Sequence, residues 1–243
     1  MAFLEAGSAI GDSRYVPESE LTAVFRALNR IRSELGDALP TAAYLRQFRP
    51  ARSLFKSPSL ACDPYNPHNE GHIVRTQVLH AILTRLRLRH MPSLPLDERL
   101  SLEALRLHDV RLDGWGSYPT HAQDAVAFAE QTGWHRRFSP EDWTTITYFI
   151  FYHPERSNPP KSDMQRRLLP MLHTLQDSDA SDLTRPPLHV PIHQIMLRTQ
   201  EATEHHLPSL AILFQVVSAG MKTGDLYEDQ LRAGEHLGLL QGT

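Results

Sequence analysis

Apolar residues recur along most of the chain at the spacing of an α-helix. Between residues 21 and 35 they occupy positions 21, 24, 25, 28, 31 and 35, which form one helix face, and Gly36 follows where a helix ends. A similar face at positions 73, 74, 78, 82, 83 and 86 predicts a helix from about Glu70 to Leu88. Strand signals are nearly absent, because no Asn-Gly or Asp-Gly turn joins two alternating apolar runs. The pattern therefore predicts an all-α fold.

Capping residues mark the ends of further helices. Acidic residues at 97 and 98 open a helix that runs to about His108, because negative charge favours the N-terminal end of the helix dipole. Ser139 and Pro140 open another that runs to about Tyr152, since serine caps a helix and proline fits its first turn. We also expect helices near 120–133, 162–180, 190–206, 209–221 and 225–239, with a kink at Pro170.

The composition is that of an ordinary globular protein, with 41% hydrophobic and 22% charged residues. The lone cysteine, Cys62, excludes an intrachain disulfide framework and fits a reducing compartment. The first residues lack the basic start of a signal peptide, and the longest apolar run, 210–221, is far shorter than the roughly 20 residues of a membrane span. We expect a soluble, cytoplasmic protein of a single domain, 1–243, that has no membrane partner.

The charge balance bears on the partners of the protein. The net charge is −3 and no basic stripe is present, so nucleic acid is an unfavourable partner. Of the 25 basic residues, 22 are arginine, which suits bidentate binding of phosphate or carboxylate. A GC-rich genome would produce the same bias without functional meaning.

The number of histidines points to a metal site, because the chain has 14 of them and imidazole is the commonest metal ligand. Six candidate ligands lie at or near predicted helix ends, where they can converge on one crevice without burying unpaired charge: His72, His108, Asp109, His121, His153 and Asp179. Imidazole with carboxylate suits Fe, Mn, Co, Ni or Zn, and a carboxylate can bridge two ions. Taken singly, each residue has a structural alternative, such as a histidine that stabilises a helix C-terminus.

The segments that carry these residues resemble those of the HD-domain metal-dependent phosphohydrolases. In chain order they are GHIVRT at 71–76, ALRLHDV at 104–110, THAQDAVAF at 120–128, ITYFIFYHP at 146–154 and DSDASDLTR at 177–185. The resemblance covers about 66–185 and departs at Leu112, where many members of the superfamily have lysine. It implies an HD-type helical bundle with its core at 66–185 and helical extensions at 1–65 and 186–243.

The resemblance also implies a set of metal ligands in which Asp109 bridges two divalent ions. One ion would be held by His72, His108, Asp109 and Asp179, and the other by Asp109, His121 and His153. Asp177 and Asp182 are acidic neighbours of this set. We expect one or two ions per chain, with Mn, Fe, Co, Ni, Mg and Zn all as candidates.

The activity implied is hydrolysis of a phosphate ester or anhydride in a small phosphorylated molecule, with a nucleotide favoured, by a metal-activated water. Asp109 and His72 are the expected catalytic residues. Arg75, one helical turn past His72, would reach a substrate phosphate, and a solvated helix face is its alternative. His68 and Glu70 would orient His72 or move protons, or simply form a polar loop before the helix.

Three other functions stay open at this point. A di-iron oxygenase is implied for a few relatives with the same ligand set. A nuclease is disfavoured by the charge of the chain. A catalytically degenerate HD domain would bind a nucleotide or a protein partner without turnover. The sequence leaves the oligomeric state open.

Overall fold

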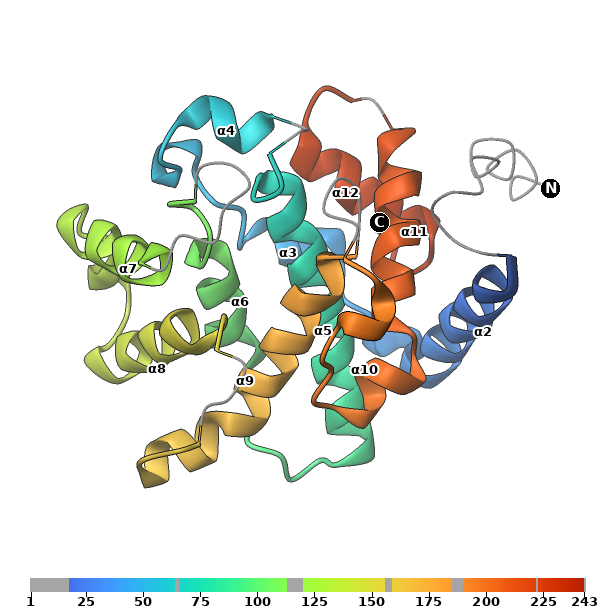
Figure 1. Ribbon diagram of the computed structural model, residues 1–243, viewed down its shortest axis with the longest axis horizontal. Helices are drawn as coiled ribbons and strands as arrows, with labels where there is room; N and C mark the ends of the chain where they lie inside the picture. The colour runs from blue at the N-terminus through green and yellow to red at the C-terminus, as the bar shows by residue number, and fades with distance from the viewer. Residues whose placement is uncertain are drawn as a thin grey trace.

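The helical spacing of the sequence corresponds to helices in the computed structural model, which describes residues 18–63, 66–112, 120–155, 159–184, 190–221 and 223–242. These residues form eleven α-helices and four 3-10 turns and contain no strand, which confirms the predicted all-α fold (Figure 1). The α-helices are α2 (Glu18–Leu35), α3 (Ala42–Arg46), α4 (Pro58–Cys62), α5 (Glu70–His90), α6 (Glu98–Leu107), α7 (His121–Gln131), α8 (Pro140–Tyr152), α9 (Asp163–Asp182), α10 (Gln200–Glu204), α11 (Leu207–Ala219) and α12 (Leu226–His236). The 3-10 turns are η1 (Gly36–Ala38), η2 (Arg52–Leu54), η3 (Trp134–Arg137) and η4 (Ile192–Gln194).

Side-chain caps fix the starts of the helices that matter for the site. Asp97, Ser139 and Ser162 each accept a hydrogen bond from the backbone N–H three residues on, at 3.1–3.2 Å, and so open α6, α8 and α9. The Asn69 side chain accepts from the N–H of His72 at 3.0 Å in the same way. The first turn of α5, where His72 stands, is therefore anchored by its own cap.

The expectation of one helix over 190–206 is wrong. This segment contains only η4 and the five-residue α10. The backbone N–H groups of Arg198 and Thr199 each donate to the buried Asp177 carboxylate at 2.8 Å, and Thr199 is extended, with φ −109° and ψ 143°. A carboxylate on α9 thus takes backbone donors that a continuous helix would need, and the long-range contact overrides the local pattern.

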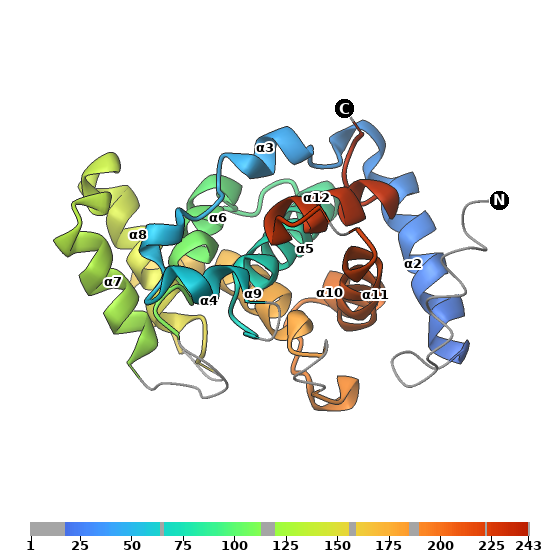
Figure 2. The same ribbon diagram turned by 90° about the horizontal axis from the view of Figure 1, so that it is seen from above.

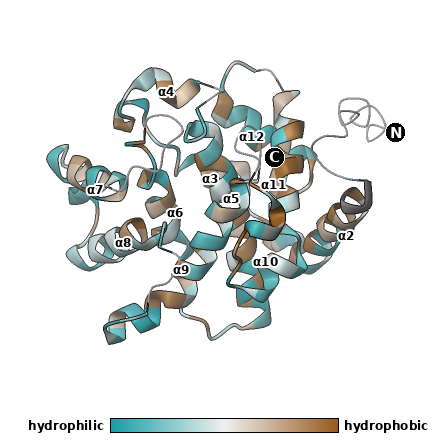
Figure 3. Ribbon diagram, viewed as in Figure 1, coloured by the Kyte–Doolittle hydropathy of each residue, from teal (hydrophilic) through white to brown (hydrophobic). Residues whose placement is uncertain are grey.

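The helices are arranged around a central pair. Helix α9 packs along α5 in the middle of the molecule, with α7 and α8 towards one end and α2 at the other, in both views (Figures 1 and 2). One cluster of buried apolar residues extends from Val24 to Leu240, so the segments before residue 66 and after residue 185 share a core with the central helices. Figure 3 shows apolar residues along α11, which lies inside this cluster. Among the described helices, none has the length and apolar character required to cross a lipid bilayer.

His80, within α5, makes the stability of the protein depend on pH. Its side chain is fully buried, and its Nε2 lies 2.6 Å from Ser101 Oγ. Burial lowers the pKa of His80 to about 3, whereas an unfolded histidine has a pKa of about 6.5. Below about pH 6.5 the unfolded chain therefore binds a proton that the folded chain does not. As the pH decreases below about 6.5, protonation of His80 in the unfolded chain lowers the free energy of unfolding by up to about 1.4 kcal/mol per pH unit.

We expect His80→Gln to make the free energy of unfolding depend less steeply on pH. The slope should decrease by up to the value that corresponds to one bound proton, about 1.4 kcal/mol per pH unit. The measurement is the free energy of unfolding in urea, determined for both proteins between about pH 7 and about pH 5. The slope is the readout, because replacing a buried side chain changes the absolute stability at every pH. Parallel curves for the two proteins would contradict the prediction.

Candidate metal centre

His72 reaches the site from the first turn of α5 and is 1% exposed. Its Nδ1 lies 2.7 Å from Oδ2 of Asp182, at the end of α9. A carboxylate only accepts hydrogen bonds, so Nδ1 of His72 carries the proton and donates it. The other ring nitrogen, Nε2, is left with its lone pair.

His108 and His153 are each held by the carbonyl of the residue three positions earlier. His108 follows α6 and donates from Nδ1 to the Leu105 carbonyl at 2.8 Å, and His153 follows α8 and donates from Nδ1 to the Ile150 carbonyl at 2.6 Å. Because a carbonyl cannot donate, the proton of each neutral ring is on Nδ1 and the lone pair is on Nε2. The C-terminal ends of two helices thus present imidazoles prepared as ligands.

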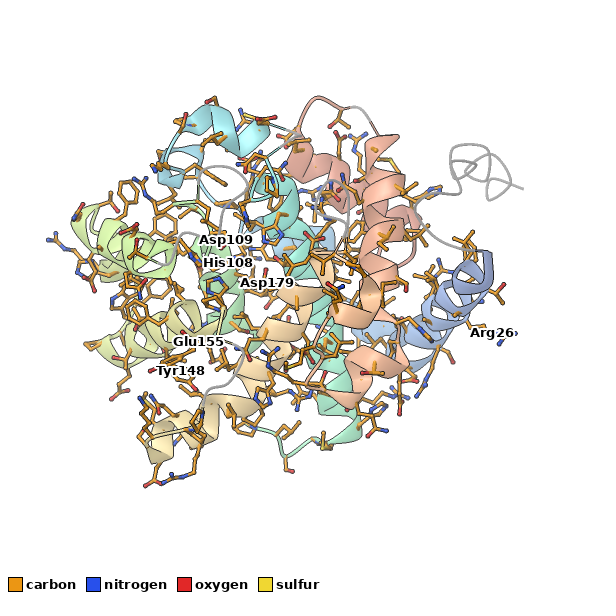
Figure 4. All side chains as sticks on the ribbon, viewed as in Figure 1. Arg26, His108, Asp109, Tyr148, Glu155 and Asp179 are labelled. Atoms are coloured by element: carbon orange, nitrogen blue, oxygen red, sulfur yellow. The ribbon has the colours of Figure 1, made fainter. Side chains whose placement is uncertain are left out.

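Four ligand atoms converge around His72. Its Nε2 lies 3.3 Å from His108 Nε2, 3.2 Å from Asp109 Oδ2 and 3.4 Å from Asp179 Oδ1. His108 Nε2 lies 3.3 Å from the same oxygen of Asp109 and 3.4 Å from that of Asp179. The labelled His108, Asp109 and Asp179 lie together near the middle of the molecule (Figure 4). These four side chains form the first ligand group, and they come from α5, α9 and the end of α6.

A second ligand group uses the other oxygen of Asp109. Asp109 Oδ1 lies 3.6 Å from His121 Nε2 and 3.5 Å from His153 Nε2, and these two nitrogens are 3.1 Å apart. His121 is the first residue of α7, and His153 directly follows α8. Asp109 therefore belongs to both groups, with one oxygen facing each.

The donor set fits a divalent transition-metal ion. Ligand nitrogens and oxygens lie about 2.1 Å from such an ion, so two ligands of one ion are separated by about 3.0 Å at right angles and about 3.4 Å in a tetrahedron. The separations of 3.1–3.6 Å found here lie within or slightly above that range. Neutral imidazole with carboxylate is also the chemistry that Fe, Mn, Co, Ni and Zn accept. This buried cluster can hold a metal ion.

The electrostatics of the cluster favour positive charge. Burial alone would lower the pKa of His108, but the carboxylates of Asp109 and Asp179 outweigh it and raise that pKa well above its ordinary value. Burial alone would raise the pKa of Asp109, but His108 and His68 outweigh it and hold that pKa well below its ordinary value. His108 and His72 lower the pKa of Asp179 in the same way. Both carboxylates are thus ionised, and their negative field is directed at the imidazole nitrogens.

The structure brings together the six ligand candidates of the sequence, but it corrects the role of Arg75. Arg75 is 3% exposed, and its Nε and Nη2 donate to the two oxygens of Asp182 at 2.8 and 3.2 Å. The alternative of a solvated helix face is therefore wrong, and the guanidinium is engaged by the Asp182 carboxylate. The same carboxylate accepts from His72, so Arg75 is a positioning residue that acts on His72 through Asp182.

The sequence contains a signal for the role of Asp182. Asp182 follows Asp179 by three residues, and Arg75 follows His72 by three, so each pair shares a helix face. Two adjacent helices that each present a ligand and, one turn on, a partner of opposite charge will bring those partners together as well. Only the packing of α9 along α5 makes the contact.

The two polar residues before His72 behave differently. His68 lies beside the centre, with its Nδ1 2.8 Å from Oδ2 of Asp109. Glu70 does not orient His72, because its buried carboxylate accepts instead from Arg49 and Arg52, at 2.9 and 3.3 Å. The expectation that Glu70 orients His72 is therefore wrong, because Glu70 forms ion pairs with arginines outside the candidate metal centre.

A cavity of about 260 Å³ adjoins the ligand groups at His153 and Asp179. Its wall is partly polar and partly apolar, and the apolar part includes Leu183, Ile195 and Met196. The one cationic side chain on its wall among the described residues, Arg198, donates to the carbonyls of Met196 and Glu155 and lies 3.7 Å from the Asp177 carboxylate. Space for a small molecule therefore lies directly beside the ligands.

In comparisons with known proteins, no protein-family model, curated protein or solved structure matches the chain. The HD-domain resemblance stays a prediction, based on the five sequence segments. The distances within the candidate metal centre do not depend on this resemblance.

Proposed function

We propose that the protein is a metal-dependent phosphohydrolase of the HD type, which cleaves a phosphate ester or anhydride bond of a small molecule, with a nucleotide as the favoured substrate. The observation that supports it best is the close approach of His72 Nε2 and His108 Nε2, which are 3.3 Å apart in a buried place beside two carboxylates. Two acceptors at that distance repel unless a proton or a metal ion lies between them.

Two ions per chain are part of the proposal, because Asp109 offers one oxygen to each ligand group. His72, His108 and Asp179 complete the first group, and His121 and His153 complete the second. When bound, such ions lower the pKa of a coordinated water towards neutrality and neutralise charge on a phosphoryl oxygen. The chain contributes the orientation, since Asp182 holds His72 and backbone carbonyls hold His108 and His153.

The cavity beside His153 and Asp179 supports a small substrate rather than a polymer, since its volume is about 260 Å³. Arg198 is already engaged by Asp177 and by carbonyl groups, so among the described residues the ligand groups are left to balance the charge of a phosphoryl group. The apolar part of the wall then receives the rest of the substrate. His68 donates to Asp109 and fixes the carboxylate that both groups share.

The test combines elemental analysis with an activity panel. Protein purified without chelator under low oxygen is analysed for metal, then assayed with p-nitrophenyl phosphate, bis-p-nitrophenyl phosphate and nucleoside mono-, di- and triphosphates in the presence of Mn, Fe, Co, Ni, Mg or Zn. We expect bound metal and release of phosphate or of a phosphate ester. Oxygen uptake by the iron form without any hydrolysis would replace this proposal with the di-iron oxygenase. Failure to bind any metal would leave a non-catalytic binding domain.

His121→Ala separates the two ligand groups. His121 belongs to the second group only, so we expect the variant to lose about one bound ion and keep the other. The measurement is metal content per chain by elemental analysis, beside the control His236→Ala, which removes an exposed histidine at the end of α12. Loss of all metal in His121→Ala, or no loss, would contradict the division into two groups.

A further inference from the structure

A second cavity, of about 480 Å³, is separate from the metal centre and is rich in arginine. It lies between η2, the start of α5, α6 and η3, and none of its lining residues is a metal ligand candidate. The residues that matter are Arg49, Arg52, Glu70, Arg106, Trp134 and Arg137.

The cavity shares two helices with the candidate metal centre. Glu70 precedes His72 by two residues on α5, and Arg106 precedes His108 by two at the end of α6. Residues two apart on a helix face different sides. The two sites therefore use different faces of α5 and of the end of α6.

One side of the cavity already holds a carboxylate. Glu70 is fully buried and accepts from Arg49 Nη2 at 2.9 Å and from Arg52 Nε at 3.3 Å. Arg49 also donates to Asp225 at 3.0 Å, so its positive charge is paired with two carboxylates. Arg52 is half exposed, and within the described residues its two terminal amino groups have no acceptor. The cavity thus presents N–H donors of Arg52 without an acceptor, beside the Glu70 carboxylate, which already accepts from two arginines.

The deeper side of the cavity has buried donors without acceptors. Arg106 is 3% exposed; its Nη1 pairs with Glu103 at 2.9 Å and its Nη2 donates to the Gln47 carbonyl. Its Nε is buried and finds no acceptor in the described part of the chain, and the same holds for the indole Nε1 of Trp134. Buried N–H groups are rarely left unpaired in folded proteins.

Arg137 adds an exposed cation at the rim. Its guanidinium lies 4.1 Å from the centre of the Trp134 ring, and that of Arg106 lies 5.4 Å from the same ring. No carboxylate among the described residues forms an ion pair with Arg137. Two guanidinium groups thus share one aromatic ring, which concentrates positive charge at the cavity.

The unused groups are all donors, and this decides the class of ligand. Four guanidinium groups face three carboxylates, those of Glu70, Glu103 and Asp225, and each of the three is already paired with an arginine. A metal ion would find no free ligand here. Arginine, with its planar fork of N–H donors, binds phosphate and carboxylate groups bidentately. Burial also lowers the pKa of Arg106, and an anion beside it would relieve that unfavourable desolvation.

We infer that this cavity is a binding site for a small multivalent oxyanion, held by Arg52, Arg106 and Arg137 together with the indole N–H of Trp134. Phosphate and carboxylate ligands share this chemistry. The site is independent of the metal centre and of the proposed hydrolysis.

The test is calorimetric titration of the full chain with pyrophosphate. Arg52→Gln/Arg137→Gln removes two exposed cations of the site, and we expect it to weaken binding by at least about tenfold. Arg166→Gln is the control, because it removes an exposed arginine of α9 that does not line the cavity. Asp109→Ala is titrated as well, since it removes the metal centre as an alternative site for pyrophosphate.

Unchanged affinity in Arg166→Gln and Asp109→Ala, with weaker binding in the double variant, supports the site. Equal affinity in the double variant and the wild type would overturn it. Binding that is lost in Asp109→Ala but kept in the double variant would overturn it too, because pyrophosphate would then occupy the metal centre.

A parallel titration with citrate assigns the ligand: tighter pyrophosphate binding indicates a phosphate, and tighter citrate binding a polycarboxylate. If neither anion binds, the inference is wrong.

Discussion

Asp109→Ala is expected to remove all bound metal and to lower any phosphohydrolase activity by at least about a thousandfold. Among the described residues, Asp109 alone belongs to both ligand groups, and its two oxygens lie 3.2–3.6 Å from four imidazole nitrogens. Loss of this carboxylate leaves each group one ligand short and removes the bridge between them. Metal content per chain and the rate of phosphate release, measured on the same preparation, check the prediction.

Two controls keep the Asp109 prediction interpretable. Asp163→Ala removes a fully exposed aspartate of α9 and should retain metal and activity. Asp109→Asn keeps the size of the side chain but not its charge, so it should lose metal while its helix content, measured by circular dichroism, stays that of the wild type. Full metal content in Asp109→Asn and Asp109→Ala would mean that the ligand assignment is wrong.

Asp182→Ala is expected to damage both stability and metal binding. Asp182 is completely buried and pairs with Arg75, which is itself 3% exposed. Removing one partner of a buried ion pair leaves an uncompensated charge, and we expect the free energy of unfolding to fall by about 3–5 kcal/mol. His72 also loses the acceptor of its Nδ1 proton, so metal affinity should fall by about 10–100-fold. Urea unfolding and metal titration measure the two effects.

A double variant separates the two roles of Asp182. Arg75→Met/Asp182→Leu replaces the whole ion pair with apolar side chains of similar size, which is often neutral or stabilising for a buried pair. We expect it to recover most of the stability but to keep the weak metal affinity, because the Nδ1 of His72 still lacks an acceptor. Recovery of metal affinity together with stability would show that Asp182 has only a structural role.

The helices that carry the ligands could be predicted because their signals are local. Asp97, Ser139 and Ser162 each cap a helix through a backbone N–H only three residues away, so a short stretch of sequence contains the whole interaction. The same applies to His108 and His153, whose Nδ1 partners are carbonyls three residues earlier in the chain. Where a helix end and its ligand lie within one turn of each other, the sequence is enough to place both.

Local patterns failed where a distant group competed for the same atoms. The segment 190–206 has a helical pattern, yet Asp177 on α9 takes the N–H groups of Arg198 and Thr199. Arg75 follows His72 by one turn, yet its guanidinium turns to Asp182, 107 residues later in the chain. In both cases a buried carboxylate needs donors, and the energy of leaving it unpaired exceeds any local preference.

The sequence by itself determined that this protein is all-α, where most of its helices begin, and which six side chains are candidates for one metal centre. The helices and their ends depend on contacts within one or two helical turns, and the six candidates follow from the residue types and chain order of five separate segments. The tertiary structure alone decided which oxygen of Asp109 faces which histidines, that Arg75 supports His72 through Asp182, and that four arginines meet around a second cavity. Those properties depend on how helices far apart in the chain pack together, and a periodic pattern gives the face of each helix but not the partner that it meets.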